Sequence, residues 1–358
     1  MASTGTSTAA AAGVSVAELE RVLFAHSAFV AQVDGGQRAE LARRDLRNLD
    51  LSNRVLSGAI LSGADLSGAN LRLAEFIETN LYCCDLRRID GRYANFSHAD
   101  MRGAVLSGSN LAHAKLNYTD FREGRMMATG EAGSQHLVNR AGTADSVNFR
   151  HSSLNGANFE NARLEGADFS GAIIQASHFK GASLEHAVFE GAVLNDVDLD
   201  DLGLPEAILR ACILAPTANA KSGRAGQLAK LAVHQRWIAS DAHDGVAAVF
   251  DGEDMRPLAD DIGKYKLTAI SARGVIAVAL DFGGAELQGA NFEDADLRGA
   301  NFENADLRGA RFHNARLDHA RFAGADLRGL ALRNGEWMTA DLSGASFSEE
   351  QLISAIRA

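Results

Sequence analysis

Residues 287–312 read LQGANFEDADLRGANFENADLRGARF, and this stretch decides the fold because it repeats every five residues. Each repeat follows the pattern Ala-(Asp/Asn)-(Leu/Phe)-X-X, with Gly often in the last place. A five-residue period matches neither the 3.6-residue turn of a helix nor the two-residue alternation of a strand. Each pentapeptide is therefore predicted to be a short extended side followed by a turn, in which Gly provides the positive φ that tight turns need.

The same period occupies three blocks of the chain, with Leu or Phe and an occasional Met or Ile at the central position. The blocks run through residues 46–126, 149–199 and 287–347, and Gly91 and Trp337 are the exceptions among their centres. Ala stands two positions before most centres. This spacing predicts a second inward position with room only for a small side chain.

The run LSGAILSGADLSGANL at residues 56–71 and the stretch quoted above resemble the pentapeptide-repeat family of bacterial type, over about 200 residues of the 358. The resemblance implies an all-β solenoid, a right-handed quadrilateral β-helix with four pentapeptides per coil, in which coils stack at about 4.8 Å. Residues twenty apart should then lie above one another. Phe292 is expected over Phe312, and Phe302 over Phe322.

The chain is predicted to form two such modules in tandem, with short capping α-helices. A disordered tail is expected over residues 1–14 and a flexible linker over 215–226, the Ala/Ser/Gly-rich stretch APTANAKSGRAG. The first module, 15–214, is expected to contain a helix (15–33), repeats (44–126), a loop that leaves the coil (128–146) and further repeats (147–214). The second, 227–358, is expected to contain a helix (227–240), degenerate repeats (247–286), regular repeats (285–347) and a terminal helix (348–357), the last because Ser348 and Gln351 match a capping box.

An internal duplication supports the two modules. Apolar residues at helical spacing follow Ser15, which has N-cap character, and the segment from Leu23 resembles the segment from Leu231. His26 then corresponds to His234. We interpret both histidines as contacts between a capping helix and the coil rather than as a ligand site.

Composition excludes several classes of function. A net charge of −11 opposes general affinity for nucleic acid or acidic membranes. The first dozen residues lack the basic and long apolar regions of a signal peptide, and the longest apolar stretch, Val275–Phe282, is too short to cross a bilayer. Three cysteines, of which Cys83 and Cys84 are adjacent, suggest no disulfide framework. A cytoplasmic location is expected.

Motifs for catalysis, cofactors or metals are not found. Ser222–Gly226 has no Lys-Ser/Thr pair after its last Gly and so differs from a phosphate-binding loop. The histidines lack metal-ligand spacing, and most Asp residues occupy outward repeat positions rather than a sheltered cleft. We therefore predict a protein that is not an enzyme, with no catalytic, cofactor-binding or metal-binding residue and no cofactor.

Charge patterning distinguishes one part of the surface. Asp-X-Arg triplets such as Asp306/Arg308 should form parallel acidic and basic ladders that cancel at a distance. Residues 151–201 instead carry nine acidic side chains and two basic ones, and Glu165 should lie above Glu185. The candidate partner-binding residues are six acids of this region and two residues of the predicted loop: Glu165, Glu185, Glu190, Asp196, Asp198, Asp200, His136 and Arg140.

These features favour a non-catalytic structural or interaction protein that presents a rigid β-helical surface to a protein partner. An alternative is implied by the resemblance, because quinolone-resistance members of that family are thought to mimic DNA and occupy the DNA-binding surface of gyrase, a type II topoisomerase. A third hypothesis places an enzymatic or sensory role in the irregular residues 215–286. Self-association through exposed coil ends stays open, as does the identity of the partner.

Overall fold

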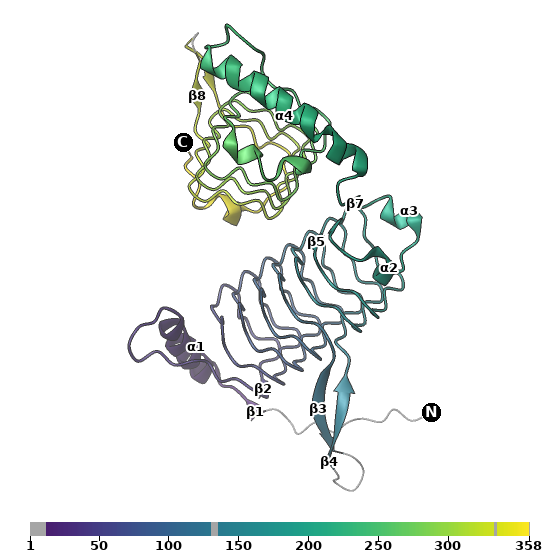
Figure 1. Cartoon of the computed structure of the whole chain (residues 1–358). Helices are drawn as coiled ribbons and strands as arrows, with labels where there is room; N and C mark the ends of the chain where they lie inside the picture. The colour runs from purple at the N-terminus through teal and green to yellow at the C-terminus, as the bar shows by residue number, and fades with distance from the viewer. Residues whose placement is uncertain (1–11, 130–134, 333–334, 358) are drawn as a thin grey trace. The chain divides into compact units, whose positions relative to one another are not determined.

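The computed structural model describes residues 12–129, 135–332 and 335–357, and the chain divides into two compact units, Met1–Ala215 and Pro216–Ala358. Each unit is a stack of coils (Figure 1). The first unit contains β1 (Ala12–Gly13), α1 (Val16–Val30), β2 (Arg44–Asp45), β3 (Gly124–Thr129), β4 (Gln135–Arg140), β5 (Ile173–Gln175), β6 (Val193–Asn195), α2 (Leu199–Leu202), α3 (Glu206–Leu209) and β7 (Ile213–Leu214). The second contains α4 (Ala218–Ala239), the 3-10 helices η2 (Arg256–Leu258) and η3 (Ile262–Lys264), β8 (Leu330–Ala331), β9 (Trp337–Met338) and the 3-10 helix η4 (Glu349–Leu352).

Parallel pairing between successive coils defines the architecture. In one column, Asp45 pairs with Asp65 and Asp65 with Asp85, and the other sides of the coil follow the same twenty-residue spacing. Along this column the N–H of Leu46 donates to the carbonyl of Asp65 at 2.7 Å. Each side contributes one paired residue before the chain turns, so most of the pairing consists of isolated bridges rather than long strands. Four pentapeptides therefore make one coil of a β-helix.

The central Leu and Phe side chains fill the interior. Phe292 stacks on Phe312 with ring centroids 5.5 Å apart, and Phe302 on Phe322 at 5.2 Å, as the twenty-residue spacing predicts. The small inward position holds Ala in most repeats because the backbone turns close to the core there. Where Thr79 replaces Ala, its hydroxyl donates to the carbonyl of Leu56 at 2.8 Å. A buried polar group at this position is thus satisfied by the neighbouring coil.

The last position of each repeat turns the chain through positive φ. Gly68 has φ of +71°, and an added Cβ would lie 2.4 Å from the Oδ1 of Asn48 in the coil before it. Asn48 itself has φ of +57°. Asn and His tolerate this conformation better than most residues, and both recur beside Gly among the positive-φ residues of the turns.

Two related helical caps cover the starts of the coil stacks. In the first unit α1 begins after Ser15, whose side chain accepts the N–H of Glu18, and it buries Leu19 and Leu23. The expectation of a disordered tail over 1–14 is wrong for Ala12 and Gly13, since β1 pairs in parallel with β2 at the open edge of the first coil. Residues 1–11 lie outside the described residues.

The predicted flexible linker at 215–226 is wrong, because α4 begins at Ala218 and continues through the expected helix 227–240 to Ala239. The side chain of Thr217 caps this helix by accepting the N–H of Ala220 at 3.1 Å. Arg224 then anchors it by donating to the carbonyl of Pro257 at 3.1 Å and pairing with Asp261. These contacts stabilise a Gly-containing helix whose composition alone resembles a linker.

Two hairpins, β3–β4 and β8–β9, interrupt the coils. The loop predicted for 128–146 has the wrong bounds. The chain leaves the coil earlier, as the hairpin β3–β4, so Met126 belongs to the hairpin rather than to the core, and it is back in the coil at Thr143, which pairs with Val105. Trp337 is likewise not a repeat centre: it lies in the hairpin β8–β9 and is 70% exposed. The regular repeats predicted for 285–347 therefore stop at Leu327 and resume at Asp341, which pairs with Arg311.

The degenerate repeats at 247–286 form regular coils from Leu267 onward, with Ala272 and Ala277 at buried centres. The turns η2 and η3 absorb extra residues in the first coil. The terminal helix predicted at 348–357 is wrong in length, since only the single turn η4 forms. Gln351 accepts the N–H of Ser348 at 2.8 Å but also donates to the carbonyls of Leu317 and Ala320, which ties the turn to the coil.

Candidate interaction site

The hairpin β3–β4 is the largest projection from the coils of the first unit (Figure 1). Its strands pair antiparallel over six residues each, and Met127 lies directly opposite Leu137. Directly opposed side chains share one face of a two-stranded ribbon. Met127 is 54% exposed and Leu137 65% exposed. The hairpin therefore presents an apolar cross-strand pair to solvent.

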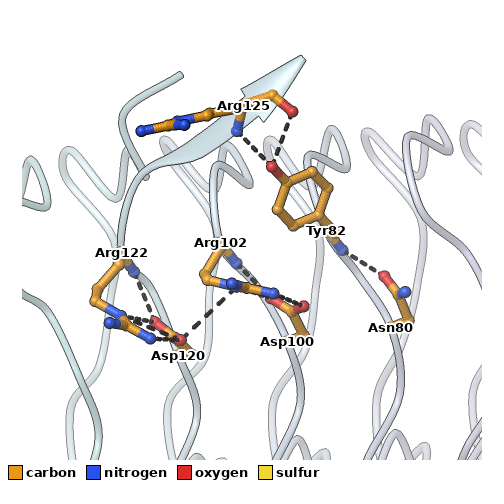
Figure 2. A network of polar contacts seen from close by, with 7 residues as sticks. All are labelled: Asn80, Tyr82, Asp100, Arg102, Asp120, Arg122 and Arg125. Atoms are coloured by element: carbon orange, nitrogen blue, oxygen red, sulfur yellow. Dashed lines mark hydrogen bonds and ion pairs between the residues drawn. The ribbon is translucent and has the colours of Figure 1, made fainter. Parts of the chain in front are cut away.

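The base of the hairpin is fixed to the coil by hydrogen bonds. The hydroxyl of Tyr82 donates to the carbonyl of Arg125 at 2.8 Å and accepts the N–H of the same residue (Figure 2). Arg140, one of the predicted partner-binding residues, helps to fix the base, because its guanidinium donates to the carbonyl of Cys83 at 2.8 Å. The backbone of His136 lies in β4, whereas its side chain is outside the described part of the structure.

An ion-pair ladder lies beside this base. Arg102 pairs with Asp100 at 2.7 Å and Arg122 with Asp120 at 2.7 Å, and Arg102 reaches Asp120 of the next coil at 3.8 Å (Figure 2). The Asp-X-Arg triplets thus neutralise each other locally, as expected. Arg125 differs, since its exposed guanidinium has no ion pair among the described residues. Arg125 thus offers an exposed cation at the base of the hairpin.

The acidic column predicted from the sequence is present but partly neutralised. Glu165 and Glu185 occupy equivalent positions in successive coils, because the neighbouring residues Arg163 and Ser183 are bridged. Arg163 pairs with Glu165 at 3.2 Å and with Asp145 at 3.4 Å, and Ser183 donates to Glu165 at 2.9 Å. Only Glu185 of the pair is left without a cationic neighbour in the described ranges.

The carboxyl groups of Asp145 and Glu165 lie at equivalent positions in successive coils and affect each other's pKa. Burial, together with a hydrogen bond to Glu165, raises the pKa of Asp145 to about 6. The hydrogen bond from Asp145, helped by Ser183, lowers the pKa of Glu165. The pair therefore carries less negative charge near pH 6 than its two carboxyl groups suggest. That weakens its likeness to a row of phosphates.

The other predicted acids do not converge on one site. Glu190 lies on a different side of the coil from Glu185, and Asp196 lies at a turn with φ of +54°. Asp198 caps α2 by accepting the N–H of Asp200 at 3.0 Å. All five of these acids are exposed: Glu185, Glu190, Asp196, Asp198 and Asp200. Counting charges along the sequence found the acids, but it missed Tyr82, Met127 and Leu137, whose roles depend on contacts across the fold.

Within the described ranges, His, Cys, Asp and Glu side chains form no group of three or more that could hold a metal ion. None of the described helices combines the length and apolar character that crossing a membrane requires. In the hairpin β3–β4, an exposed apolar pair, the exposed Arg125 and a base that is hydrogen-bonded to the coil occur together.

Comparison with known proteins identifies the repeat. A family model described as "Pentapeptide repeats" matches residues 37–72, 69–108, 145–181, 177–214 and 285–322. A search of curated proteins finds no match.

Solved structures with the same repeat are similar at low sequence identity. HetL, a pentapeptide repeat protein involved in heterocyst differentiation regulation in the cyanobacterium Nostoc, is 20% identical, with 90% of this chain and 99% of HetL covered and a TM-score of 0.20. QnrB1, a plasmid-mediated fluoroquinolone resistance protein, is 19% identical, with 50% and 91% covered and a TM-score of 0.25. A pentapeptide repeat protein of the Arabidopsis thaliana thylakoid lumen is 26% identical, with 36% and 69% covered and a TM-score of 0.18.

Proposed function

Because this chain belongs to the pentapeptide-repeat family, we propose that it is a non-catalytic interaction protein built on right-handed, quadrilateral β-helices. The coils serve as a rigid scaffold, and the hairpin β3–β4 presents the docking site for a protein partner. The six acidic candidates and Arg140 then contribute solubility and local structure, and Met127 and Leu137 contact the partner.

One observation carries this proposal, the exposure of the Met127–Leu137 pair on a hairpin whose base is tied to the coil. Large apolar side chains that oppose each other on an exposed ribbon favour burial by a second molecule. A partner that covers them would gain about 25 cal/mol for each Å² of apolar surface removed from water. Because the base of the hairpin is rigid, little conformational entropy is lost when a partner binds. Recognition is often carried by loops on rigid scaffolds for this reason.

The experiment replaces residues 127–137 by Asn-Gly, which joins the opposed residues Met126 and Val138 by a two-residue turn and leaves the coils intact. Wild type and variant are used to capture proteins from a lysate of the source cells, followed by mass spectrometry. We expect the variant to lose a protein that wild type retains, with unchanged far-UV circular dichroism. The doubly substituted Met127→Lys/Leu137→Lys chain is the matched control that keeps the hairpin. Equal capture by all three chains would contradict the proposal.

The alternative function, modulation of a type II topoisomerase by DNA mimicry, is supported by the exposed carboxylates of Glu185 and Glu190. It predicts that purified protein inhibits gyrase supercoiling and that Glu185→Gln/Glu190→Gln reduces the inhibition. The hairpin replacement separates the two functions, because DNA mimicry through these acids does not need Met127 or Leu137.

A further inference from the structure

The outer edge of β3 has backbone groups that nothing in the hairpin uses. In an antiparallel pair, opposed residues alternate between those that exchange both hydrogen bonds and those whose N–H and C=O point away from the partner strand. Since Tyr82 binds both backbone groups of Arg125, these groups point away from β4. Two residues on, the N–H and C=O of Met127 must point to the same edge. No hydrogen bond within the described part of the chain occupies them.

Tyr82 therefore ends the free edge. Its hydroxyl occupies the backbone N–H and C=O of Arg125, next to the coil, as Figure 2 shows. The backbone N–H and C=O of Met127 stay available to a partner. An open strand edge requires an extended backbone as its partner, because only such a backbone supplies donors and acceptors at matching intervals.

The side chains along this edge specify the partner further. Arg125 and Met127 lie two residues apart and so share one face of the ribbon, which Leu137 extends on the other strand. Arg125 is exposed and has no ion pair in the described ranges, whereas the opposed Asn139 contacts Glu123 at 3.4 Å. An added strand would thus meet a cation and an apolar surface on the same face.

We propose that the β3 edge binds an extended peptide segment as a third strand, and that the segment carries an acidic and an apolar side chain two residues apart. This inference rests on the proposed function of the hairpin and names its mode of recognition. The acidic residue pairs with Arg125, the apolar residue covers Met127 and Leu137, and the backbone of Met127 supplies the hydrogen bonds.

The test measures fluorescence anisotropy of a labelled, acetylated and amidated peptide, Thr-Glu-Thr-Leu-Thr-Val-Thr, added to the full-length protein. Wild type is expected to bind with a Kd below about 1 mM. Met127→Pro removes the outward N–H without touching a hydrogen bond of the hairpin, and binding should weaken about tenfold. Tyr82→Phe frees the backbone N–H and C=O of Arg125 and should strengthen binding of the peptide severalfold.

Two controls protect the test from a misfolded hairpin. Arg125→Glu should reject the peptide and accept its Glu→Lys analogue, which reverses the charge preference without removing the edge. A peptide N-methylated along its backbone should bind neither wild type nor the variants. The proposal is overturned if wild type does not bind the peptide, or if N-methylation and Met127→Pro leave binding unchanged. If Met127→Lys/Leu137→Lys abolishes capture of the cellular partner while backbone N-methylation leaves binding of the peptide unchanged, the proposed function stands and strand addition is wrong.

Discussion

His26 accepts the backbone N–H of Ala39 through Nδ1 at 3.1 Å, and His234 accepts that of Ala248 through Nδ1 at 3.2 Å. Both imidazoles are buried, and each stacks on the aromatic ring three residues later in its helix. An Nδ1 that accepts a hydrogen bond is unprotonated, so both caps require the neutral ring. The duplicated segment thus contains the same contact between helix and first coil in each unit.

Acidification is expected to loosen both caps. Burial lowers the pKa of His26 and of His234 below the ordinary value of 6.5. The unfolded chain then takes up protons at these sites before the folded chain does, so their contribution to stability is complete above pH 6.5 and is lost as the pH falls towards the folded pKa. Urea unfolding between pH 7.5 and 5 should show this loss. His26→Gln/His234→Gln keeps a hydrogen-bond acceptor that does not titrate and should reduce the pH dependence of the free energy of unfolding. The substitution His186→Gln, at an exposed histidine, should leave that pH dependence unchanged.

Asp145 is expected to act in the opposite direction. Its pKa is raised to about 6, so the folded chain holds a proton that the unfolded chain releases near pH 4, and the stabilisation present at low pH is lost as the pH rises through 6. Asp145→Asn should therefore raise the free energy of unfolding by about 1 kcal/mol at pH 8, a figure reduced from the full shift because the site is partly exposed. At pH 4 the substitution should have little effect. A variant less stable than wild type at pH 8 would contradict the raised pKa of Asp145.

Phe322 and Trp337 distinguish the coil from the hairpin of the second unit. Both occupy positions that the five-residue period marks as central, yet Phe322 is buried and Trp337 is exposed. Phe322→Ala should cost about 3–5 kcal/mol through the cavity it leaves, and Trp337→Ala less than about 0.5 kcal/mol. Chemical denaturation followed by circular dichroism measures both. Similar losses would mean that Trp337 belongs to the core.

Gly223 and Gly226 test whether α4 extends through the expected linker. A Cβ added at either meets no atom within 4 Å, and neither residue has positive φ. Gly→Ala at each site should stabilise the helix by about 0.5–1 kcal/mol. As a control, Gly68→Ala should destabilise, because its φ is positive and the Oδ1 of Asn48 lies where the Cβ would be. A flexible linker would show no gain in helicity from either substitution in α4.

The sequence predicted those parts of the fold that depend on local spacing. The stacking of Phe302 on Phe322 follows from the repeat alone, since every side of the coil has the same length. The hairpins could not be predicted in the same way, because Met126 and Trp337 happen to fall on the five-residue period while their chain has already left the coil. The helical start of α4 depends on Arg224 reaching Asp261, a contact that composition does not reveal.

The candidate site was harder to predict than the fold. The sequence shows where the acidic residues are, but it does not show that Arg163 lies close enough to Glu165 to neutralise its charge. Tyr82 is still less visible, because its function comes from a hydrogen bond to Arg125 in a segment that has left the coil. Exposure of Met127 likewise follows from the direction of β3, which periodicity does not fix.

The hairpins do not change which side of the coil follows which. Val105 pairs with Thr143 rather than with residue 125, so the chain re-enters the stack at the angle from which it departed. Insertions and deletions within such an excursion can therefore alter recognition while every later coil keeps its orientation. Loss of a single pentapeptide from a coil would instead rotate all subsequent sides by one corner.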